Sequence, residues 1–389
     1  MSEWEEYKLG EVVNILDSKR IPLSSKERSI RQGKFPYYGA QGIIDYVDDY
    51  IFDGTYLLVA EDGENLKSKK QNIARLASGK YWVNNHAHIL ESNEYSDIRY
   101  ICYALNITDI SGYITGSAQP KLNQANLVAI TLKLPPIQIQ KNIADALSSL
   151  DDKIAVNRKI NENLEQQAQA LFKSWFVDFE PFKNGEFVDS ELGRIPKGWK
   201  VDDIYAYIDV VYGAPYKSSL FNEDKKGLPL IRIRDLKTNS PQIYTPEILP
   251  TTEYVDAGDI IAGMDAEFIP YMWLGDKGVL NQRCCKFKGK DHRISNFYIL
   301  NLVKPKLEFV QSYKTGTTVS HLGKADIDRF HFVTPPLEVI LSFSKMIDSM
   351  KNEVVTRAQE SRCLAELRDT LLPKLMSGEL KVNDIEKQL

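Results

Sequence analysis

Apolar side chains recur at alternating steps of four and three residues along two long segments, 135–175 and 335–375. The first run extends from Ile143 to Trp175 and the second from Phe343 to Leu375. This spacing is the a/d pattern of a coiled coil, so it predicts two helices of about forty residues, each roughly 60 Å long. A helix of that length exceeds the diameter of a small domain and needs a partner along its apolar seam.

The two seams match position for position at a spacing of 200 residues. Such a repeat predicts two copies of one unit, each ending in a long helix. The helices of one chain can then pair antiparallel around an internal pseudo-two-fold axis, and pairing in a homodimer is the alternative. We expect the helices to pair through Ile143, Leu147, Leu150, Ile154, Asn157, Asn161, Leu164, Leu171, Ile347, Met350, Val354, Arg357, Ser361, Leu364 and Leu371.

The middle of each seam is polar, with Asn157 and Asn161 in the first helix and Arg357 and Ser361 in the second. Polar residues at seam positions cost stability but fix the register and orientation of a coiled coil. We therefore expect these residues to set the pairing, and a break in the seam is the alternative interpretation.

The segments that precede the two helices also correspond. Strand-like runs such as 56–60, separated by glycines, precede a helical segment near 97–105, and residues 128–134 read as a strand entering the first long helix. Trp199 corresponds to Trp4, and Asn281-Gln-Arg corresponds to Asn84-Asn-His. We predict an α+β protein, with mixed α/β domains at 1–134 and 199–334, spacer helices at 135–178 and 335–378, a linker at 179–198 and a tail at 379–389.

Composition narrows the class of protein. The 389-residue chain has 43% hydrophobic residues and a formal net charge of −4. The negative net charge argues against a surface that binds nucleic acid over its whole extent. The N-terminal segment is acidic and polar, unlike a signal peptide, so we expect a cytoplasmic protein. The cysteines lack Cys-x-x-Cys spacing and read as reduced and structural: Cys102, Cys284, Cys285 and Cys363.

Motifs for catalysis are not convincing. The Pro-Pro pairs at 135–136 and 335–336 stand at expected helix starts, where proline is explained by its fixed φ, and no phosphate-binding Gly-rich loop has the required spacing. His86 and His88 could form half a metal site, but two rings on one face of a strand is the simpler interpretation. Asp62-x-Glu64-x-x-Lys67 faintly resembles a nuclease set, yet the second copy has no equivalent. We expect no catalytic residue and no metal site in this chain.

Two domains carried by a long spacer, without an active site, suggest two DNA-reading heads. Arg, Lys, Asn and Gln pair with base edges in the major groove, whereas Ser and Thr position phosphates. Matching loops of the two halves supply these side chains, although each loop alone could be an ordinary turn. The candidate DNA-binding residues are Lys19, Arg20, Asn84, Asn85, His86, Ser117, Gln119, Lys121, Lys217, Arg232, Arg234, Gln282, Arg283, Lys314, Thr315 and Thr317.

Five segments, distributed over nearly the whole chain, resemble the specificity subunits of type I restriction-modification systems. They are Thr115-Gly-Ser-Ala-Gln-Pro-Lys-Leu, Leu134-Pro-Pro-Ile-Gln-Ile-Gln, Ser174-Trp-Phe-Val-Asp-Phe-Glu-Pro-Phe, Gly193-Arg-Ile-Pro-Lys-Gly-Trp and Leu367-Arg-Asp-Thr-Leu-Leu-Pro-Lys-Leu-Met-Ser-Gly-Glu-Leu. The second helix departs from the pattern, because it opens without the glutamines that follow Pro136.

This resemblance implies two target recognition domains, each reading half of a bipartite double-stranded DNA site. It further implies two modification subunits, which bind S-adenosylmethionine and methylate adenine, and restriction subunits, which use ATP and Mg²⁺; the chain itself is expected to carry no cofactor. The alternative is a stand-alone or fused DNA methyltransferase or a nuclease-associated DNA-binding protein, which S-adenosylmethionine binding by the isolated chain would reveal. A structural scaffold, the third possibility, would show no sequence preference on DNA.

Overall fold

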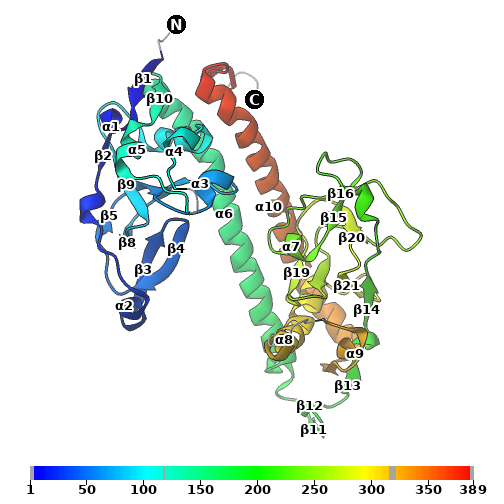
Figure 1. Ribbon diagram of the computed structural model, residues 1–389. Coiled ribbons are helices and arrows are strands. Elements are labelled where there is room, and N and C mark those ends of the chain that lie inside the picture. The colour runs from blue at the N-terminus through cyan, green and yellow to red at the C-terminus, as the bar shows by residue number, and fades with distance from the viewer. Residues whose placement is uncertain (1–3, 117–118, 315–320, 386–389) are drawn as a thin grey trace. The chain divides into compact units, whose positions relative to one another are not determined.

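The computed structural model describes residues 4–116, 119–314 and 321–385. The chain divides into two compact units: unit 1 contains residues 1–152 and 364–389, and unit 2 contains residues 153–363 (Figure 1). Each long helix is divided between the two units, so each unit contains a mixed α/β domain and a pair of helical segments.

Unit 1 contains ten strands and several short helices in its described part. The strands are β1 (Glu5–Lys8), β2 (Val13–Ile15), β3 (Gln32–Gly39), β4 (Gly42–Val47), β5 (Phe52–Asp53), β6 (Tyr56–Ala60), β7 (Ala74–Ala77), β8 (Lys80–Val83), β9 (Ala87–Ser92) and β10 (Thr131–Leu134). The helices are α1 (Leu9–Val12), α2 (Ser25–Ile30), α3 (Asn65–Ser68), α4 (Ile98–Ile107), α5 (Gln124–Ala129) and α11 (Val382–Ile385), with 3₁₀ turns η1 (Asp17–Lys19) and η2 (Ser111–Tyr113).

Two four-stranded sheets form the domain of unit 1. One has the order β2-β9-β6-β7 and is antiparallel, and the other has the order β4-β3-β8-β5, in which β3 and β8 run parallel. Strand β1 pairs antiparallel with β10, immediately before the long helix, with Glu5 opposite Leu134. The start of the helix is thus tied to the start of the chain.

Unit 2 repeats this arrangement. Its strands are β11 (Phe187–Ser190), β12 (Gly193–Pro196), β13 (Lys200–Asp203), β14 (Ile208–Tyr212), β15 (Leu228–Ile231), β16 (Tyr244–Thr245), β17 (Tyr254–Val255), β18 (Ile260–Gly263), β19 (Pro270–Met272), β20 (Gly278–Leu280), β21 (Cys284–Gly289) and β22 (His331–Thr334). The helices are α7 (Ile233–Leu236), α8 (Asn296–Lys314) and α9 (Lys324–Ile327), with 3₁₀ turns η3 (Glu180–Phe182), η4 (Ile204–Ala206) and η5 (Ser218–Leu220).

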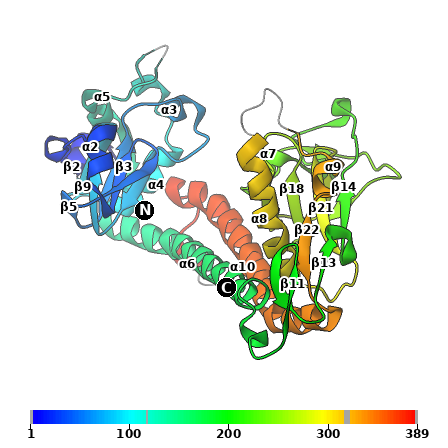
Figure 2. The same ribbon diagram turned by 90° about the horizontal axis from the view of Figure 1, so that it is seen from below.

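The sheets of unit 2 have the same strand orders as those of unit 1. One sheet is β14-β21-β18-β19, the other is β16-β15-β20-β17 with β15 and β20 parallel, and β13 pairs with β22 as β1 pairs with β10. Helix α8 packs along the first sheet, against β18, β19 and β21 (Figure 2). The repeat seen in the sequence is therefore a repeat of fold, which confirms the predicted α+β class.

The long helices are α6 (Ile137–Phe176) and α10 (Leu337–Ser377). In unit 1 the first half of α6 packs on the end of α10, where Ile143 and Leu147 share a core with Leu375. In unit 2 the end of α6 packs on the start of α10, with the rings of Phe176 and Phe343 4.9 Å apart. The helices are antiparallel in both units.

The seam is filled by contacts within the chain. Every seam position from Ile143 to Trp175 and from Phe343 to Leu375 is buried or half-buried. Helix α6 continues without a break through Asn157, whose side chain is fully buried and hydrogen-bonded to α10. Pairing of the two helices of one chain thus accounts for the seam without a second copy.

Two sequence predictions about short segments need correction. Residues 128–134 are not one strand, because the side chain of Asn123 caps α5 and the strand begins only at Thr131. Residues 179–198 do not form an open linker. They contain the β11–β12 hairpin, and the ring of Phe182 lies 5.0 Å from that of Trp199, so this connection is packed onto unit 2.

Candidate nucleic-acid interface

Three segments of unit 1 meet beyond the end of β6. The amide of Glu61 donates to the carbonyl of His86 at 2.9 Å, and the amide of Leu122 donates to the carbonyl of Glu61 at 2.8 Å. Asp62 and Lys121 form an isolated antiparallel bridge. The turn between β8 and β9 and the segment around Lys121, far apart in sequence, are therefore joined by backbone bonds to the same two residues.

The side chains at this junction form a charged cluster. Asp62 Oδ2 lies 2.6 Å from His86 Nδ1, and Asn84 Oδ1 accepts the amide of His86 at 2.8 Å. Asn84 is buried, so it shapes the turn and does not reach solvent. The side chains of His86 and Lys121 are 50% and 52% exposed, so both are accessible to solvent.

Unit 2 builds the same junction from equivalent positions. The amide of Met264 donates to the carbonyl of Arg283 at 2.8 Å, and the amide of Leu322 donates to the carbonyl of Met264 at 2.7 Å. Asp265 and His321 form the isolated antiparallel bridge, in the place of Asp62 and Lys121. The backbone frame is thus the same in both units.

The second cluster has an aspartate at the position of Asp62 but different side chains around it. Asp265 Oδ2 lies 3.0 Å from Arg283 Nη1, and Asp265 Oδ1 lies 2.7 Å from His321 Nδ1. Asn281 Oδ1 accepts the amide of Arg283 at 3.1 Å, as Asn84 does for His86. Arg283 and His321 are 59% and 48% exposed. Asn85 and Gln282 occupy the same turns and are also exposed.

A buried ion network supports the cluster of unit 1. His88 is buried, with Nδ1 2.5 Å from Asp17 Oδ2 and Nε2 2.7 Å from the carbonyl oxygen of Leu122. Burial acts to raise the pKa of Asp17, but the hydrogen bonds from His88 and the Ile89 amide bring this pKa below its ordinary value. The network ties η1 and β9 to the segment after Lys121.

Arg20, one of the DNA-binding candidates, belongs to this network. Its Nη1 donates to Glu61 Oε2 at 2.8 Å and to the carbonyl of Ala87 at 3.0 Å, and its side chain is only 16% exposed. Burial acts to raise the pKa of Glu61, but hydrogen bonding from Arg20 and the charge of His88 bring it below its ordinary value. A guanidinium engaged in this way supports the fold.

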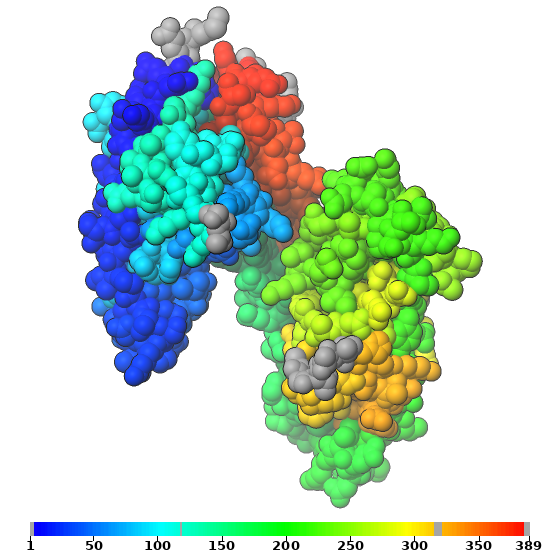
Figure 3. All heavy atoms as spheres, viewed as in Figure 1, coloured from blue at the N-terminus to red at the C-terminus, as the bar shows by residue number. Residues whose placement is uncertain are grey.

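The loop before Lys121 is held by a tight turn. The amides of Thr115 and Lys121 each donate to the other's carbonyl, at 2.8 and 2.7 Å. Gly116 has a φ of +84°, and a Cβ there would lie 2.2 Å from the carbonyl oxygen of Gln119, so only glycine fits. Gln119 is exposed. Lys67 of α3 donates to the carbonyl of Gly116, so this loop lies beside α3 on the surface of unit 1 (Figure 3).

The remaining candidates differ in their surroundings. Lys19, Lys217 and Arg234 are exposed, outside the two clusters. Arg232 is held by the buried carboxylate of Asp235 at 3.2 Å, and Lys314 Nζ by Asp326 Oδ2 at 2.6 Å, so both cations have structural partners. Ser117, Thr315 and Thr317 lie outside the described residues.

The arrangement of the histidines differs from the expected strand alternation. His86 lies in the turn before β9 and faces Asp62, whereas His88 lies on β9 and faces Asp17. Lys67 donates to the carbonyl of Gly116. Within residues 4–116, 119–314 and 321–385, no group of three or more His, Cys, Asp or Glu residues is placed to hold a metal ion.

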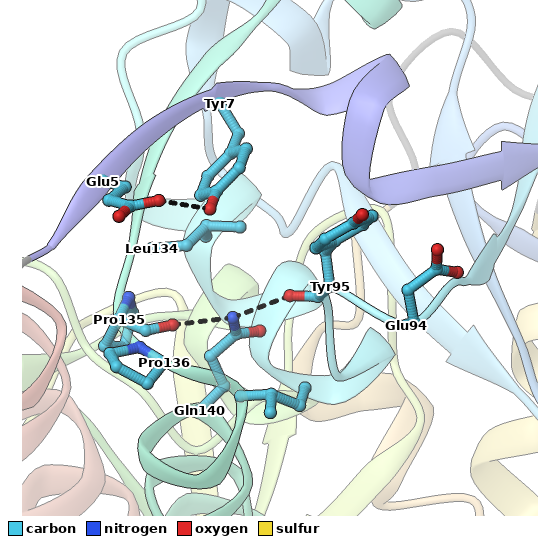
Figure 4. Close-up of a pocket in the computed structure, with 9 residues that line it drawn as sticks. Glu5, Tyr7, Glu94, Tyr95, Leu134, Pro135, Pro136 and Gln140 are labelled. Carbon is cyan, nitrogen blue, oxygen red and sulfur yellow. Dashed lines mark hydrogen bonds between the residues drawn. The ribbon is translucent and has the colours of Figure 1, made fainter.

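A pocket of about 290 Å³ lies where β1, β10 and the start of α6 meet (Figure 4). Gln140 is buried there, and its Nε2 donates to the carbonyls of Tyr95 and Pro135 at 3.0 and 2.9 Å. The equivalent position in α10 is Ile340, and Ser344 of α10 instead accepts the Ser295 amide at 2.9 Å. The glutamine missing from the second helix is thus an internal tie between helix and domain.

Asp62 and Asp265 were not predicted as shared carboxylates. The available signal was that each aspartate stands two residues beyond the end of an equivalent strand, β6 or β18. The described helices include none that is long and apolar enough to span a membrane.

Comparison with known proteins identifies the family with which this chain shares its sequence and architecture. Residues 1–166 and 177–360 match the family model of the type I restriction modification DNA specificity domain. The MjaIX specificity subunit of Methanocaldococcus jannaschii is 30% identical over 72% of this chain and 66% of its own length, just under two thirds. The HindI specificity subunit of Haemophilus influenzae is 22% identical over 98% of this chain and its whole length.

A solved structure shares the fold. The S subunit of a type I restriction-modification system from M. genitalium superposes with a TM-score of 0.60 over 96% of both chains, at 14% identity. Because the family model covers most of the sequence, in two copies that correspond to the two domains, the chain belongs to the family of type I restriction-modification DNA specificity proteins.

Proposed function

We propose that this chain is the DNA-specificity subunit of a type I restriction-modification complex and that each unit reads one half of a bipartite DNA site. The observation that carries the proposal is the pair of equivalent clusters, which hold exposed side chains able to donate hydrogen bonds on one backbone frame. His86 and Lys121 face solvent in unit 1, and Arg283 and His321 do so in unit 2. One frame with two sets of side chains suits two different half-sites.

The partners and chemistry follow from the family. Two modification subunits would bind S-adenosylmethionine and methylate adenine, and restriction subunits would supply ATP- and Mg²⁺-dependent steps. The paired helices α6 and α10 would dock the modification subunits and set the distance between half-sites. The chain itself would be non-catalytic and cytoplasmic, because its substrate is cellular or invading DNA.

The net charge of −4 supports a dependence on partners. Phosphate neutralisation supplies most non-specific DNA affinity, and an acidic chain offers few such contacts. We therefore expect weak DNA binding by the isolated chain and an increase of orders of magnitude when the modification subunit is added.

The test is to express the chain with its modification partner in cells that lack adenine methylation and to map methylated adenines. A bipartite motif with a fixed gap is the expected result. Methylation at a continuous motif, or tight sequence-specific binding by the isolated chain, would contradict the proposal. Binding of S-adenosylmethionine by the isolated chain would favour the alternative of a fused methyltransferase.

A further inference from the structure

The two clusters divide into constant and variable side chains. Asp62 and Asp265 are the same residue at equivalent positions, and so are the turn-shaping Asn84 and Asn281. The exposed positions differ, with His86 against Arg283 and Lys121 against His321. The residues that are the same in both units are suited to position the cluster. The exposed residues that differ between the units are suited to read different DNA sequences.

The two aspartates are better enclosed than the exposed side chains of their clusters. The side chains of Asp62 and Asp265 are 19% and 30% exposed, whereas those of His86, Lys121, Arg283 and His321 are about half exposed. Asp265 contacts one side chain from each of two loops, Arg283 at 3.0 Å and His321 at 2.7 Å. In unit 1 two carboxylates make these contacts. Asp62 Oδ2 lies 2.6 Å from His86 Nδ1, and Glu61 Oε1 lies 3.2 Å from Lys121 Nζ.

We propose that Asp62 and Asp265 are positioning residues for DNA recognition, which orient His86 in unit 1 and both Arg283 and His321 in unit 2 toward base edges. This inference rests on the proposed function and adds which residues read each half-site. The carboxylate restricts the rotamers of the long side chains before DNA arrives, so less conformational entropy is lost on binding. The negative charge of the carboxylate also repels phosphates, which weakens contacts with DNA of any sequence.

The reading groups define the chemistry of the half-sites. The ion pair with Asp265 uses Nη1 of Arg283, and the Nε–Nη2 edge of the guanidinium is a two-donor fork. Such a fork matches the O6 and N7 acceptors of guanine in the major groove. The half-site of unit 2 therefore contains a guanine read by Arg283, and the half-site of unit 1 contains an acceptor read by His86 or Lys121.

The experiment uses the complete complex with its modification subunit and DNA libraries randomised at one half-site at a time. Methylation rates are measured for the native chain and for Asp62→Asn, Asp265→Asn, His86→Ala and Arg283→Ala. Asp189→Asn is the matched control, because Asp189 is an exposed aspartate on the β11–β12 hairpin, 3.9 Å from Arg194. Thermal unfolding is recorded for every variant.

We expect Asp265→Asn and Arg283→Ala to reduce discrimination at the same base position, by about tenfold or more. Discrimination at the other half-site should stay native. Asp62→Asn and His86→Ala should do the same at the opposite half-site. Both Asn variants should also bind non-specific duplex more tightly and with a steeper salt dependence, which a merely structural aspartate would not produce. Asp62→Glu should restore part of the discrimination.

Two results separate the possible failures. If the native complex modifies a bipartite site and both Asn variants, folded as the native chain, keep full discrimination, the positioning role is wrong while the proposed function stands. If the native complex recognises no bipartite site, the proposed function and this inference both fail. Should an Asn variant unfold, His86→Ala and Arg283→Ala still decide, because changes spread over both half-sites would refute the assignment.

Discussion

The polar centre of the helix pair allows a quantitative prediction. Asn157 is fully buried, and its Nδ2 donates to Glu360 Oε2 at 2.8 Å and to Ser361 Oγ at 3.3 Å. Its Oδ1 accepts from Arg357 Nη1 at 3.1 Å, so positions 200 residues apart in the sequence meet here. Asn157→Ala removes all three hydrogen bonds and leaves a small void in the seam.

The expected destabilisation is about 2 kcal/mol. Glu360 is exposed and can form hydrogen bonds with water instead, so the loss of its hydrogen bond to Asn157 contributes little to the destabilisation. Arg357 is only 25% exposed and already has its Nε buried without a hydrogen-bond partner, so removal of its acceptor costs roughly 1.5–3 kcal/mol. Asn157→Leu should cost less than Asn157→Ala, because leucine fills the seam position with apolar surface.

Urea unfolding followed by circular dichroism gives the free energy of unfolding for each variant. A double-mutant cycle with Arg357→Met isolates the pair, since methionine keeps the apolar stem of the arginine. We expect a coupling energy of about 1 kcal/mol or more. An Asn157→Ala variant within about 0.5 kcal/mol of the native chain, or fully additive single effects, would refute this view of the centre of the seam.

Three further predictions concern the spacer, pH and packing. Adding one heptad to each helix, near Asn157 and Arg357, should lengthen the helix pair by about 10 Å and the gap between half-sites by at most about three base pairs. Methylome sequencing measures this gap, and an active variant that keeps the original gap would show that the helices do not set it. Burial acts to raise the pKa of Asp17, but hydrogen bonding from His88 brings this pKa below its ordinary value. The ionised Asp17 carboxylate should therefore stabilise the fold fully above the unfolded pKa of about 3.9, and this stabilisation should be lost as pH falls through the folded pKa. Urea titrations across this acid range should show a weaker pH dependence for Asp17→Asn, and an unchanged slope would contradict the role of Asp17. Trp199→Ala should destabilise unit 2 by about 3–5 kcal/mol because Trp199 is buried among aromatic rings, and a native melting temperature would show that the connection at 179–198 is not packed as described.

Features that depend on local periodicity could be predicted from the sequence. Helices α6 and α10 follow from their four-and-three apolar spacing, because each helical turn places such residues on one stripe. The repeat at 200 residues gave the duplicated fold, and the polar residues at Asn157 and Arg357 marked the centre of the seam. These are properties of the order of residues along the chain.

The composition of the two charged clusters depended on the tertiary structure. Asp62 lies 24 residues from His86 and still further from Lys121. The pairing of β6 with β9 brings His86 to Asp62, and an isolated backbone bridge brings Lys121 there. Residue type alone could not separate His86 from Arg20, since both are polar side chains that can donate hydrogen bonds to DNA.

Burial made that distinction. Arg20 lies among Asp17, Glu61 and main-chain carbonyls and supports the fold, whereas His86 is exposed at the rim of its cluster. The sequence by itself therefore determined the helices, their pairing positions and the repeat, because these follow from the period of apolar residues. The tertiary structure decided which polar side chains face solvent together, because that depends on strand order and burial, which no local pattern encodes.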